Sequence, residues 1–414
     1  MKTYSALLLT SLVLTACGGG GDSPTATANV PVTVAPAVTT QTTVTPTVTV
    51  TVAPVIDPIP TPKASFTAIQ LSPSEYAIIN TQVNNAKIIY RETVLPYRQT
   101  VALSHHISQI KRVENLVTGA LYTTNDYSIV DGNLVINPSG AIPMLGVSFI
   151  STILSTSPYA SQSYNKDGSP LHLAWDYFPN QIAVTYATDK VTDYLDTPQP
   201  LPRLSSLIAN KKQVTINFVG DSITVGGDSS SNLGMAPNQK PWSQLVTGWL
   251  ATKGSNVLYR NVATGGMSSS YGADTTKTDL SVASDVLVIA YGMNDQAASM
   301  PVATFMSNIS SMVAKMKNIN PDVEIILVSG FKPNVSWMYS NSQFIDQYKI
   351  AMQAFAKEQT ALGTNVVVAD VTAETDRILQ SKSFFDITSN GVNHPNDFFH
   401  AVYAQTILHK IGML

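Results

Sequence analysis

Apolar residues in the second half of the chain follow two different periods. Short, nearly continuous apolar runs predict buried strands, at residues 214–219, 257–262, 285–290, 323–328 and 365–369. Apolar residues at helical spacing between them predict amphipathic helices, at residues 240–253, 302–316 and 344–362, with a last helix starting near Asn396. Strands and helices in this order are typical of a parallel sheet that helices cover on both faces. We therefore predict a three-layer α/β domain at residues 205–414.

Residues 63–196 carry a different pattern. Three stretches combine apolar and polar residues as half-buried strands do, at residues 87–94, 127–136 and 182–186. The second stretch contains Asp131-Gly132 between apolar runs, which predicts a hairpin turn. These signals predict a β-rich, sandwich-like accessory domain at residues 63–196. Closely spaced prolines predict a linker to the α/β domain at residues 197–204.

The N-terminus has the organisation of an export signal. Lys2 gives a positive start, residues 6–14 are apolar but too few to span a bilayer, and Leu14-Thr-Ala-Cys17 follows. This arrangement resembles the bacterial lipoprotein signal, in which the lipidated cysteine comes last. The resemblance implies a signal peptide at residues 1–17, cleavage before Cys17 and a diacylglycerol on its sulfur. An ordinary secretory signal with a chance cysteine is the alternative.

Residues 18–62 are rich in Thr, Val and Pro and contain no aromatic residue, which predicts an extended, disordered tether. The expected location is the bacterial cell envelope, to which the lipid would anchor the protein. The two residues after the cysteine are Gly18 and Gly19, and neither is an acidic residue of the kind associated with inner-membrane retention. This favours the outer membrane if the cell has one.

Composition narrows the possible partners. The chain has 414 residues, of which 44% are hydrophobic, and is long enough for two domains with sizeable cores. Its net charge is −3 and it has no basic run, so nucleic acid is not an expected partner. Cys17 is the only cysteine, which excludes a disulfide within the chain. The only contact with a membrane that we expect is the one made by the lipid anchor.

Several residues of the accessory segment could in principle bind ligands. Its histidines lack partner ligands at metal spacing, so we expect structural or surface roles and no metal, for His105, His106 and His172. Its aromatic residues could form a platform for a sugar, although a place in the core is the favoured interpretation, for Tyr159, Tyr164, Trp175 and Tyr177.

Candidate catalytic residues follow the predicted strands of the α/β domain. Ser222 ends the first strand in Gly-Asp-Ser, a glycine-rich loop with Gly266 follows the second, and Asn294 follows the third. His394 precedes the last helix. Active residues of parallel sheets collect at the carboxyl ends of the strands, so we expect these side chains to meet. A serine hydroxyl, a histidine base and N–H donors are the parts that acyl transfer requires.

Gly-Asp-Ser also occurs at residues 21–23 and 227–229. Neither copy follows a predicted strand, so Ser222 is the only candidate nucleophile among the three. We expect His400 and His409, inside the last helix, to be surface or packing residues.

Four blocks at these positions resemble the SGNH, or GDSL, hydrolase family: Gly-Asp-Ser-x-x-x-Gly at 220–226, Asn-x-x-x-x-Gly at 261–266, Gly-x-Asn-Asp at 292–295 and His-Pro at 394–395. The resemblance implies that Ser222 is the nucleophile and His394 the general base. It implies an oxyanion hole made by the backbone N–H groups of Ser222 and Gly266 and the side chain of Asn294. Asp221 and Asp295 would fix their turns, and neither metal nor cofactor is implied. The Gly-x-Ser-x-Gly motif of the other large serine-esterase fold is absent.

One position departs from the family pattern. An aspartate three residues before the histidine usually orients the ring, but this position is Gly391. The sequence leaves a backbone carbonyl, Asn390, Asn393 or Asp386 as possible orienting groups.

These features predict an exported serine ester hydrolase that works through an acyl-enzyme, most simply a carbohydrate O-acetylesterase acting on an acylated glycan. The substrate class rests on analogy with the family. A lipase or lysophospholipase is the alternative enzyme. A surface-binding lipoprotein with a degenerate site, for which Gly391 is the main argument, is the alternative from another class.

Overall fold

A computed structural model describes residues 65–80, 82–83, 86–151, 161–173, 175–189, 196–274, 276 and 280–414. The expected signal peptide, Cys17 and the tether at 18–62 lie outside these residues. Residues from Lys63 to Leu414 form one compact unit. No helix in the described part of the chain is long and apolar enough to cross a membrane.

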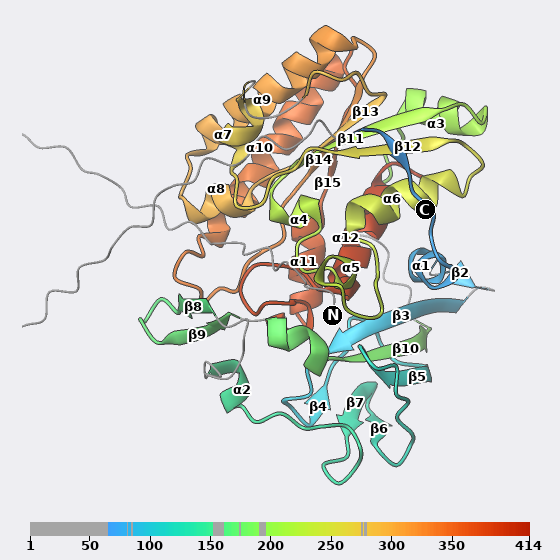
Figure 1. Ribbon diagram of the computed structural model, residues 1–414, viewed down its shortest axis with the longest axis vertical. Helices are drawn as coiled ribbons and strands as arrows, with labels where there is room; N and C mark the ends of the chain where they lie inside the picture. Colours follow the sequence, from blue (N-terminus) through green and yellow to red (C-terminus); the bar gives the residue numbers. More distant parts are fainter. Residues whose placement is uncertain are drawn as a thin grey trace, which may run out of the picture. The chain divides into compact units, whose positions relative to one another are not determined.

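A six-stranded sheet forms the centre of the α/β part, in the order β1-β12-β11-β13-β14-β15 (Figure 1). Its strands are β1 (Thr67–Ala68), β11 (Val214–Gly220), β12 (Val257–Asn261), β13 (Val286–Ala290), β14 (Glu324–Val328) and β15 (Val366–Ala369). The last five are mutually parallel, which confirms the predicted parallel sheet, whereas β1 pairs antiparallel with β12. The strand order reverses at β11, and such a reversal opens a crevice beyond the carboxyl ends of the strands.

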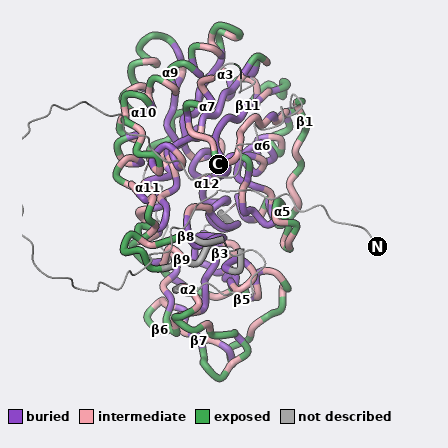
Figure 2. Tube along the Cα trace, turned by 60° about the vertical axis from the view of Figure 1, so that its left-hand side comes forward, coloured by how far each residue is buried: buried purple, intermediate pink, exposed green. Residues whose placement is uncertain are grey.

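Successive residues of the parallel strands contribute to two hydrophobic cores. In β13, Val286 and Val288 belong to one core, whereas Leu287 and Ile289 belong to the other. The first core contains residues of α3 (Pro202–Ala209), α6 (Trp242–Ala251), α11 (Val371–Leu379) and α12 (Asp397–Lys410). The second contains residues of α9 (Val302–Ile319) and α10 (Ser342–Ala361), on the other side of the sheet (Figure 1). The predicted three-layer arrangement is therefore confirmed, and the strands are buried between the layers (Figure 2).

Shorter helices connect or flank these layers: α1 (Pro73–Ile79), α2 (Ser148–Ser151), α4 (Ser222–Val225), α5 (Ser230–Leu233), α7 (Ser269–Ala273), α8 (Met293–Ala297), and the 3₁₀ helices η1 (Trp175–Asn180) and η2 (Phe384–Asp386). Helix α3 begins at Pro202, inside the segment predicted as a linker. Proline suits the first turn of a helix because the N–H groups there have no acceptor within the helix, so the N–H that proline lacks is not needed. Helix α11 was not predicted from the sequence, and its N-terminus is capped by Asp370, which accepts a hydrogen bond from the N–H of Ala373.

Antiparallel sheets form the segment predicted to be β-rich. One is β2 (Gln82–Val83)-β3 (Ala86–Val94)-β10 (Ile182–Thr188)-β5 (Gln109–Asn115), another is β4 (Thr100–Val101)-β7 (Asn133–Ile136)-β6 (Tyr127–Val130), and β8 (Ser161–Tyr164) pairs with β9 (Pro170–Leu173). The predicted hairpin is confirmed, since β6 and β7 pair across Asp131 and Gly132. Both turn residues have positive φ, at 51° and 74°, as a tight hairpin turn requires.

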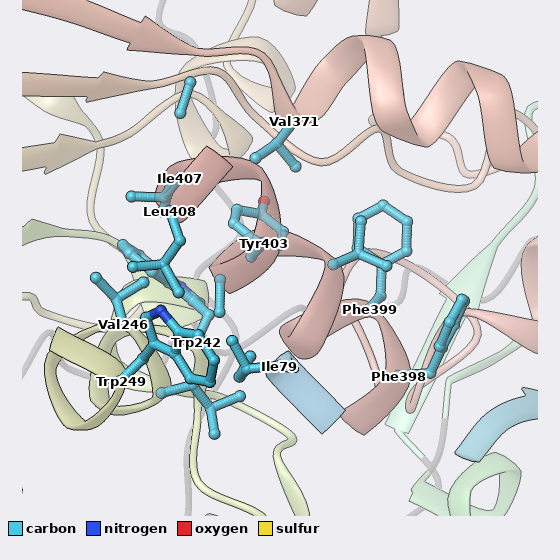
Figure 3. Packing of buried hydrophobic residues seen from close by; sticks show 14 of the residues in the cluster. Ile79, Trp242, Val246, Trp249, Val371, Phe398, Phe399, Tyr403, Ile407 and Leu408 are labelled. Carbon is cyan, nitrogen blue, oxygen red and sulfur yellow. The ribbon is translucent and has the colours of Figure 1, made fainter. Parts of the chain in front are cut away.

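The antiparallel sheets and the α/β part share one hydrophobic core. Val94 and Val184 of the antiparallel sheet belong to the same cluster as Phe399 of α12. Ile79 of α1 joins the α6–α12 packing, in which the rings of Trp242 and Tyr403 stack with centroids 5.7 Å apart (Figure 3). Alternation predicts that a strand has an apolar face but not which partner covers that face. In the structure, residues of the α/β part cover the apolar face of the antiparallel sheet, so the predicted segments 63–196 and 205–414 share this core.

Candidate active site

Ser222 is the first residue of α4, directly after β11 and the turn at Gly220 and Asp221. A side chain on Gly220 would collide with the carbonyl oxygen of Ala290 on the neighbouring strand, so only glycine fits. Asp221 caps α4 by accepting a hydrogen bond from the N–H of Ile223, at 3.0 Å. The sharp strand-to-helix turn therefore fixes the backbone of Ser222, whose side chain lies at the carboxyl edge of the sheet.

Asp221 and Asp295 are buried and connect the loops of this edge. Burial raises the pKa of Asp221 to about 7, although hydrogen bonds from the N–H groups of Ile223 and Met293 act against this rise. Asp295 accepts hydrogen bonds from the N–H and the hydroxyl of Ser269, and burial raises its pKa. One carboxyl thus connects the nucleophile turn to α8, and the other connects α8 to α7.

The structure brings Ser222 and His394 into direct contact. The Ser222 hydroxyl lies 2.8 Å from Nε2 of His394. The histidine stands in a closed loop between η2 and α12, where the hydroxyl of Thr388 donates to the carbonyl oxygen of His394 at 2.8 Å. Asn390 Oδ1 accepts hydrogen bonds from three backbone N–H groups of the same loop, including that of His394. The two residues lie far apart in the sequence, yet they form one hydrogen-bonded pair.

Asp228 is the group that contacts the other ring nitrogen. Its Oδ2 lies 2.9 Å from Nδ1 of His394, and its side chain is 6% exposed. A carboxylate only accepts, so the proton of the neutral ring belongs on Nδ1, which leaves Nε2 free to accept from Ser222. Asp228 belongs to the Gly-Asp-Ser copy at 227–229, which follows no predicted strand and was therefore not predicted to be part of the site.

The orienting groups considered from the sequence were therefore wrong. Asp386 lies elsewhere and accepts from the N–H of Leu95 at 2.8 Å. Asn390 and Asn393 bond to each other, at 3.1 Å, and to the loop backbone. Asp228 was missed because it follows a helix rather than a strand. The one local signal for it was an aspartate beside glycine in the turn that follows the nucleophile.

The loop that carries Asp228 is hydrogen-bonded to the loop of His394 and to α12. Ser389 donates its hydroxyl proton to the carbonyl oxygen of Asp228 at 2.9 Å. Asp397, in the first turn of α12, accepts hydrogen bonds from both the N–H and the hydroxyl of Ser230. Nε2 of His400 lies 3.3 Å from the carbonyl oxygen of Gly227. The carboxylate therefore faces the ring from a loop that hydrogen bonds to Ser389 and to residues of α12 hold in place.

The pKa of His394 reflects opposing effects. Burial lowers the pKa, whereas the charge of Asp228, the hydrogen bond to Asp228 and the charge of Asp221 raise it, and the result lies above the ordinary value of histidine. A base with a raised pKa accepts the serine proton more readily once it is neutral, but it becomes neutral only at higher pH.

The predicted oxyanion donors lie on neighbouring loops. The loop after β12 is tied to the nucleophile strand by Thr264, whose N–H donates to the carbonyl oxygen of Gly220 at 3.0 Å. Gly266 has φ of 76°, and a Cβ on it would meet nothing within 4 Å, so the space beside its Cα is open. Nδ2 of Asn294 donates to the carbonyl oxygen of Met267 at 3.0 Å. The role of these groups as oxyanion donors stays a prediction.

The remaining candidates have other surroundings. His400 is fully buried, and burial lowers its pKa to about 4. His409 lies 2.8 Å from the carbonyl oxygen of Asp196, and His106 pairs with Asp189 near the surface. His105 is bonded to Ser104, and burial lowers its pKa to about 4. The side chain of His172 lies outside the described residues.

Of the four aromatic candidates, Tyr177 is buried and stacks on Phe385, whereas Tyr164 is exposed. Tyr159 and the side chain of Trp175 lie outside the described residues. No group of three or more His, Cys, Asp or Glu in the described part of the chain is arranged to hold a metal ion.

Comparison with known proteins identifies the segment that carries this site. Fold and side-chain arrangement together are those of a serine ester hydrolase. Residues 218–402 match the model of the GDSL-like lipase/acylhydrolase family, so this segment is a GDSL-like acylhydrolase domain. It includes Ser222, Asp228 and His394 and lies within the predicted α/β domain at 205–414.

Several solved structures are similar to this chain. A two-domain esterase active on acetylated mannans is 21% identical, with a TM-score of 0.39, over 51% of this chain and 53% of that one. An acetylxylan esterase from Geobacillus stearothermophilus is 18% identical, with a TM-score of 0.36, over 48% and 94%. A family 3 carbohydrate esterase from Talaromyces cellulolyticus is 18% identical, with a TM-score of 0.35, over 46% and 94%. The chain thus spans about half the length of the two-domain esterase. No curated protein matches the sequence.

Proposed function

We propose that this protein is an esterase that forms an acyl-enzyme on Ser222. The observation that carries the proposal is the continuous array from Ser222 Oγ to His394 Nε2, at 2.8 Å, and from His394 Nδ1 to Asp228, at 2.9 Å. Such an array raises the nucleophilicity of the hydroxyl only as the reaction proceeds, when the proton moves to the ring and the carboxylate stabilises the imidazolium.

The reaction has two balanced halves. Ser222 Oγ attacks the ester carbonyl carbon while its proton moves to His394 Nε2. The tetrahedral intermediate collapses, the bond to the alcohol oxygen breaks, and His394 gives the proton to the leaving alcohol. A water then attacks the acyl group on Ser222, giving its proton to His394, which returns it to the serine oxygen as the acid leaves.

The developing negative charge on the carbonyl oxygen needs fixed donors. We assign the N–H groups of Ser222 and Gly266 and the amide of Asn294. A side-chain amide has two N–H donors. The bond from Asn294 to the carbonyl oxygen of Met267 fixes its plane and leaves the second N–H for the substrate oxygen.

The array also bears on the possibility of a degenerate binding protein. Gly391 was the main argument for that alternative because it removes the usual orienting carboxylate. Asp228 supplies a carboxylate at hydrogen-bonding distance from the same ring nitrogen. The proposal of a working esterase is therefore favoured over that of a surface-binding lipoprotein.

For the substrate we propose an O-acetylated glycan. Trp337 and Tyr339 lie edge to face, with ring centroids 5.6 Å apart, and both are partly exposed. The exposed Tyr164 of β8 adjoins them, since its carbonyl oxygen accepts from the N–H of Met338 at 2.9 Å. We call Tyr164, Trp337 and Tyr339 the aromatic rim. Tyr and Trp present an apolar ring face with a polar edge, which suits a sugar with an apolar C–H face and a hydroxylated margin.

The loop that bears the aromatic rim is hydrogen-bonded to the loop of His394, residues 387–396 between η2 and α12, which we call the histidine loop. Asn334 donates its backbone N–H to the carbonyl oxygen of Val392 at 2.8 Å and its side-chain amide to that of Gly391 at 3.0 Å. A glycan held on the rim would thus lie beside the loop that carries His394.

A lipase or lysophospholipase is the second candidate, because the same loop exposes Val335 and Met338. Exposed apolar side chains beside a site also suit a lipid chain.

We propose further that the protein is exported and anchored through a lipid on Cys17. Replacement of Cys17 by serine should move the protein from the membrane fraction to the soluble fraction, and unchanged fractionation would exclude the anchor.

The deciding experiment uses residues 63–414, the compact unit. Release of p-nitrophenol from esters of increasing chain length, and of acetate from acetylated mannan and xylan oligosaccharides, is measured for the wild type and Ser222→Ala. We expect turnover of acetyl esters and glycans by the wild type only. Preference for long-chain esters would favour the lipase. Equal activity of both proteins would exclude Ser222 as the nucleophile.

A further inference from the structure

The histidine loop differs from the other loops of the candidate site in its support. The loops of Ser222, Gly266 and Asn294 each follow a strand of the parallel sheet. The histidine loop instead follows α11 and η2, so no parallel strand leads into it. Its position therefore has to be fixed by other contacts.

Asn334 supplies two of these contacts from within the α/β part, and the segment of the antiparallel sheet supplies others. Gln181, directly before β10, is fully buried, and its Nε2 donates to the carbonyl oxygens of Phe385 and Thr388, at 3.0 and 2.9 Å. Its Oε1 accepts from Nδ2 of Asn396 at 2.9 Å. The amide group is thus occupied on both sides by the two ends of the histidine loop.

Both ends lead directly to His394. Thr388, which Gln181 holds through the backbone, donates its hydroxyl proton to the carbonyl oxygen of His394 at 2.8 Å. Asn396, which Gln181 holds through the side chain, caps α12 by accepting from the N–H of Phe399 at 3.2 Å. Only Pro395 separates this cap from the histidine.

Strand β3 holds the same loop from a second position. The hydroxyl of Thr93 donates to the carbonyl oxygen of Asp386 at 2.6 Å and lies 2.8 Å from Nδ2 of Asn396. Lys382 donates to the carbonyl oxygen of Thr93 at 2.8 Å and pairs with Glu92 at 2.9 Å, with neither charged side chain exposed. Since Thr93 and Asn396 are buried, displacing the loop would leave these polar groups without partners, which costs free energy for each. Lys382 lies between α11 and η2, so its contacts fix the segment that leads into the loop.

We infer that the antiparallel sheet is part of the catalytic apparatus, with Gln181 and Thr93 as positioning residues that hold His394 against Ser222 and Asp228. The inference rests on the proposed function for its kinetic consequence. It gives the segment predicted to be an accessory domain a role in positioning His394. Figure 1 shows β3 and β10 directly below α11 and α12.

The test uses Gln181→Met, which keeps the length of the side chain and removes its donors and acceptor. Loss of registration by a fraction of an ångström lowers catalysis steeply, so we expect kcat for p-nitrophenyl acetate to fall about 10- to 100-fold with little change in KM. Thr93→Val, which keeps the shape of the side chain, should act in the same direction and serves if the first variant fails to fold.

Gln405→Met is the matched control. Gln405 also bridges two parts of the compact unit, donating to the carbonyl oxygen of Ile78 at 2.7 Å, but it does not contact the histidine loop. We expect it to lower the unfolding midpoint while leaving kcat unchanged. Folded Gln181→Met and Thr93→Val proteins with wild-type kcat would overturn the inference.

A second readout does not depend on turnover. The titration of His394 is followed by NMR of labelled histidines, with the resonance assigned from His394→Gln. Displacement of the ring from Asp228 should lower its pKa in Gln181→Met but not in Gln405→Met. If the wild type hydrolyses no ester, the proposed function fails while the titration still decides the positioning role. An unchanged titration in Gln181→Met would refute that role.

Discussion

Asp228 and His394 form the hydrogen bond that orients the histidine, at 2.9 Å between Oδ2 and Nδ1. The carboxylate comes from the loop after the nucleophile helix, not from the loop of the histidine itself. The chemistry depends on the arrangement of the groups in space, so the same carboxylate can enter from another loop. Gly391 has φ of 78°, a backbone conformation that suits glycine better than aspartate.

Asp228→Asn should reduce kcat by several orders of magnitude, about 10⁴-fold where a comparable carboxylate was replaced. The amide can bond to the ring but cannot stabilise the imidazolium. Asp228 raises the pKa of His394, so this variant should shift the acidic limb of the pH dependence of kcat/KM to lower pH. The measurement is a full pH profile with p-nitrophenyl acetate, and Asp131→Asn in the exposed hairpin turn is the control. A profile that stays in place would show that Asp228 does not interact with the working base.

Asn294→Ala should lower kcat about 10²- to 10³-fold with a small change in KM, the usual effect of removing one oxyanion donor. The donor stabilises the charge of the transition state more than it binds the neutral ester. Steady-state kinetics on a short ester separates the two constants. A rise in KM alone would assign Asn294 to substrate binding instead.

Trp337→Ala should raise KM for an acetylated oligosaccharide about fivefold, while kinetics on p-nitrophenyl acetate stay close to the wild type. Stacking of a sugar on an aromatic ring contributes on the order of 1 kcal/mol, and p-nitrophenyl acetate has no sugar ring that would make this contact. Parallel assays of both substrates test this expectation. Equal losses on both would indicate that Trp337 supports the histidine loop rather than the sugar.

Lys382→Met should destabilise the protein by about 3–5 kcal/mol, because it leaves the carboxylate of Glu92 buried without its cation. Equilibrium unfolding in urea measures the change. The double variant Lys382→Met/Glu92→Gln removes both charges and should be more stable than the single variant. If the two unfold at the same denaturant concentration, the ion pair does not determine the stability of this interface.

His400 should make the protein less stable as the pH falls. Its Nδ1 accepts from the N–H of Trp242 and its Nε2 faces the carbonyl oxygen of Gly227, so the neutral ring is satisfied. Burial lowers its pKa to about 4, against about 6.5 in the unfolded chain. The unfolded state therefore binds a proton first, and stability is lost as pH falls from about 6.5 towards 4.

The comparison with His400→Gln isolates this contribution. Burial raises the pKa values of Asp221 and Asp397 to about 7, which acts in the opposite direction over the same range. The stability advantage of the wild type over His400→Gln should narrow by about 2 kcal/mol between pH 8 and pH 5. Urea unfolding at both pH values measures it, and a constant difference would contradict the buried neutral ring.

The sequence by itself determined the parallel sheet, the order along the chain of its five parallel strands and of most of the helices between them, and the loops that carry Ser222, Gly266, Asn294 and His394. Helices α3 and α11 were not predicted. The predicted features depend on local periodicity and on residues that follow strand ends, which a single sequence displays. The hairpin at Asp131-Gly132 was readable for the same reason, since its turn requires particular residues at positive φ.

Only the tertiary structure decided which carboxylate faces His394 and what supports its loop. Asp228 and Gln181 reach that loop from distant segments, and no local pattern distinguishes them from ordinary turn or strand-end residues. The shared core of the antiparallel and α/β parts was hidden for a related reason. An apolar face signals that it will be buried, but the partner that buries it is selected by the packing of the whole chain.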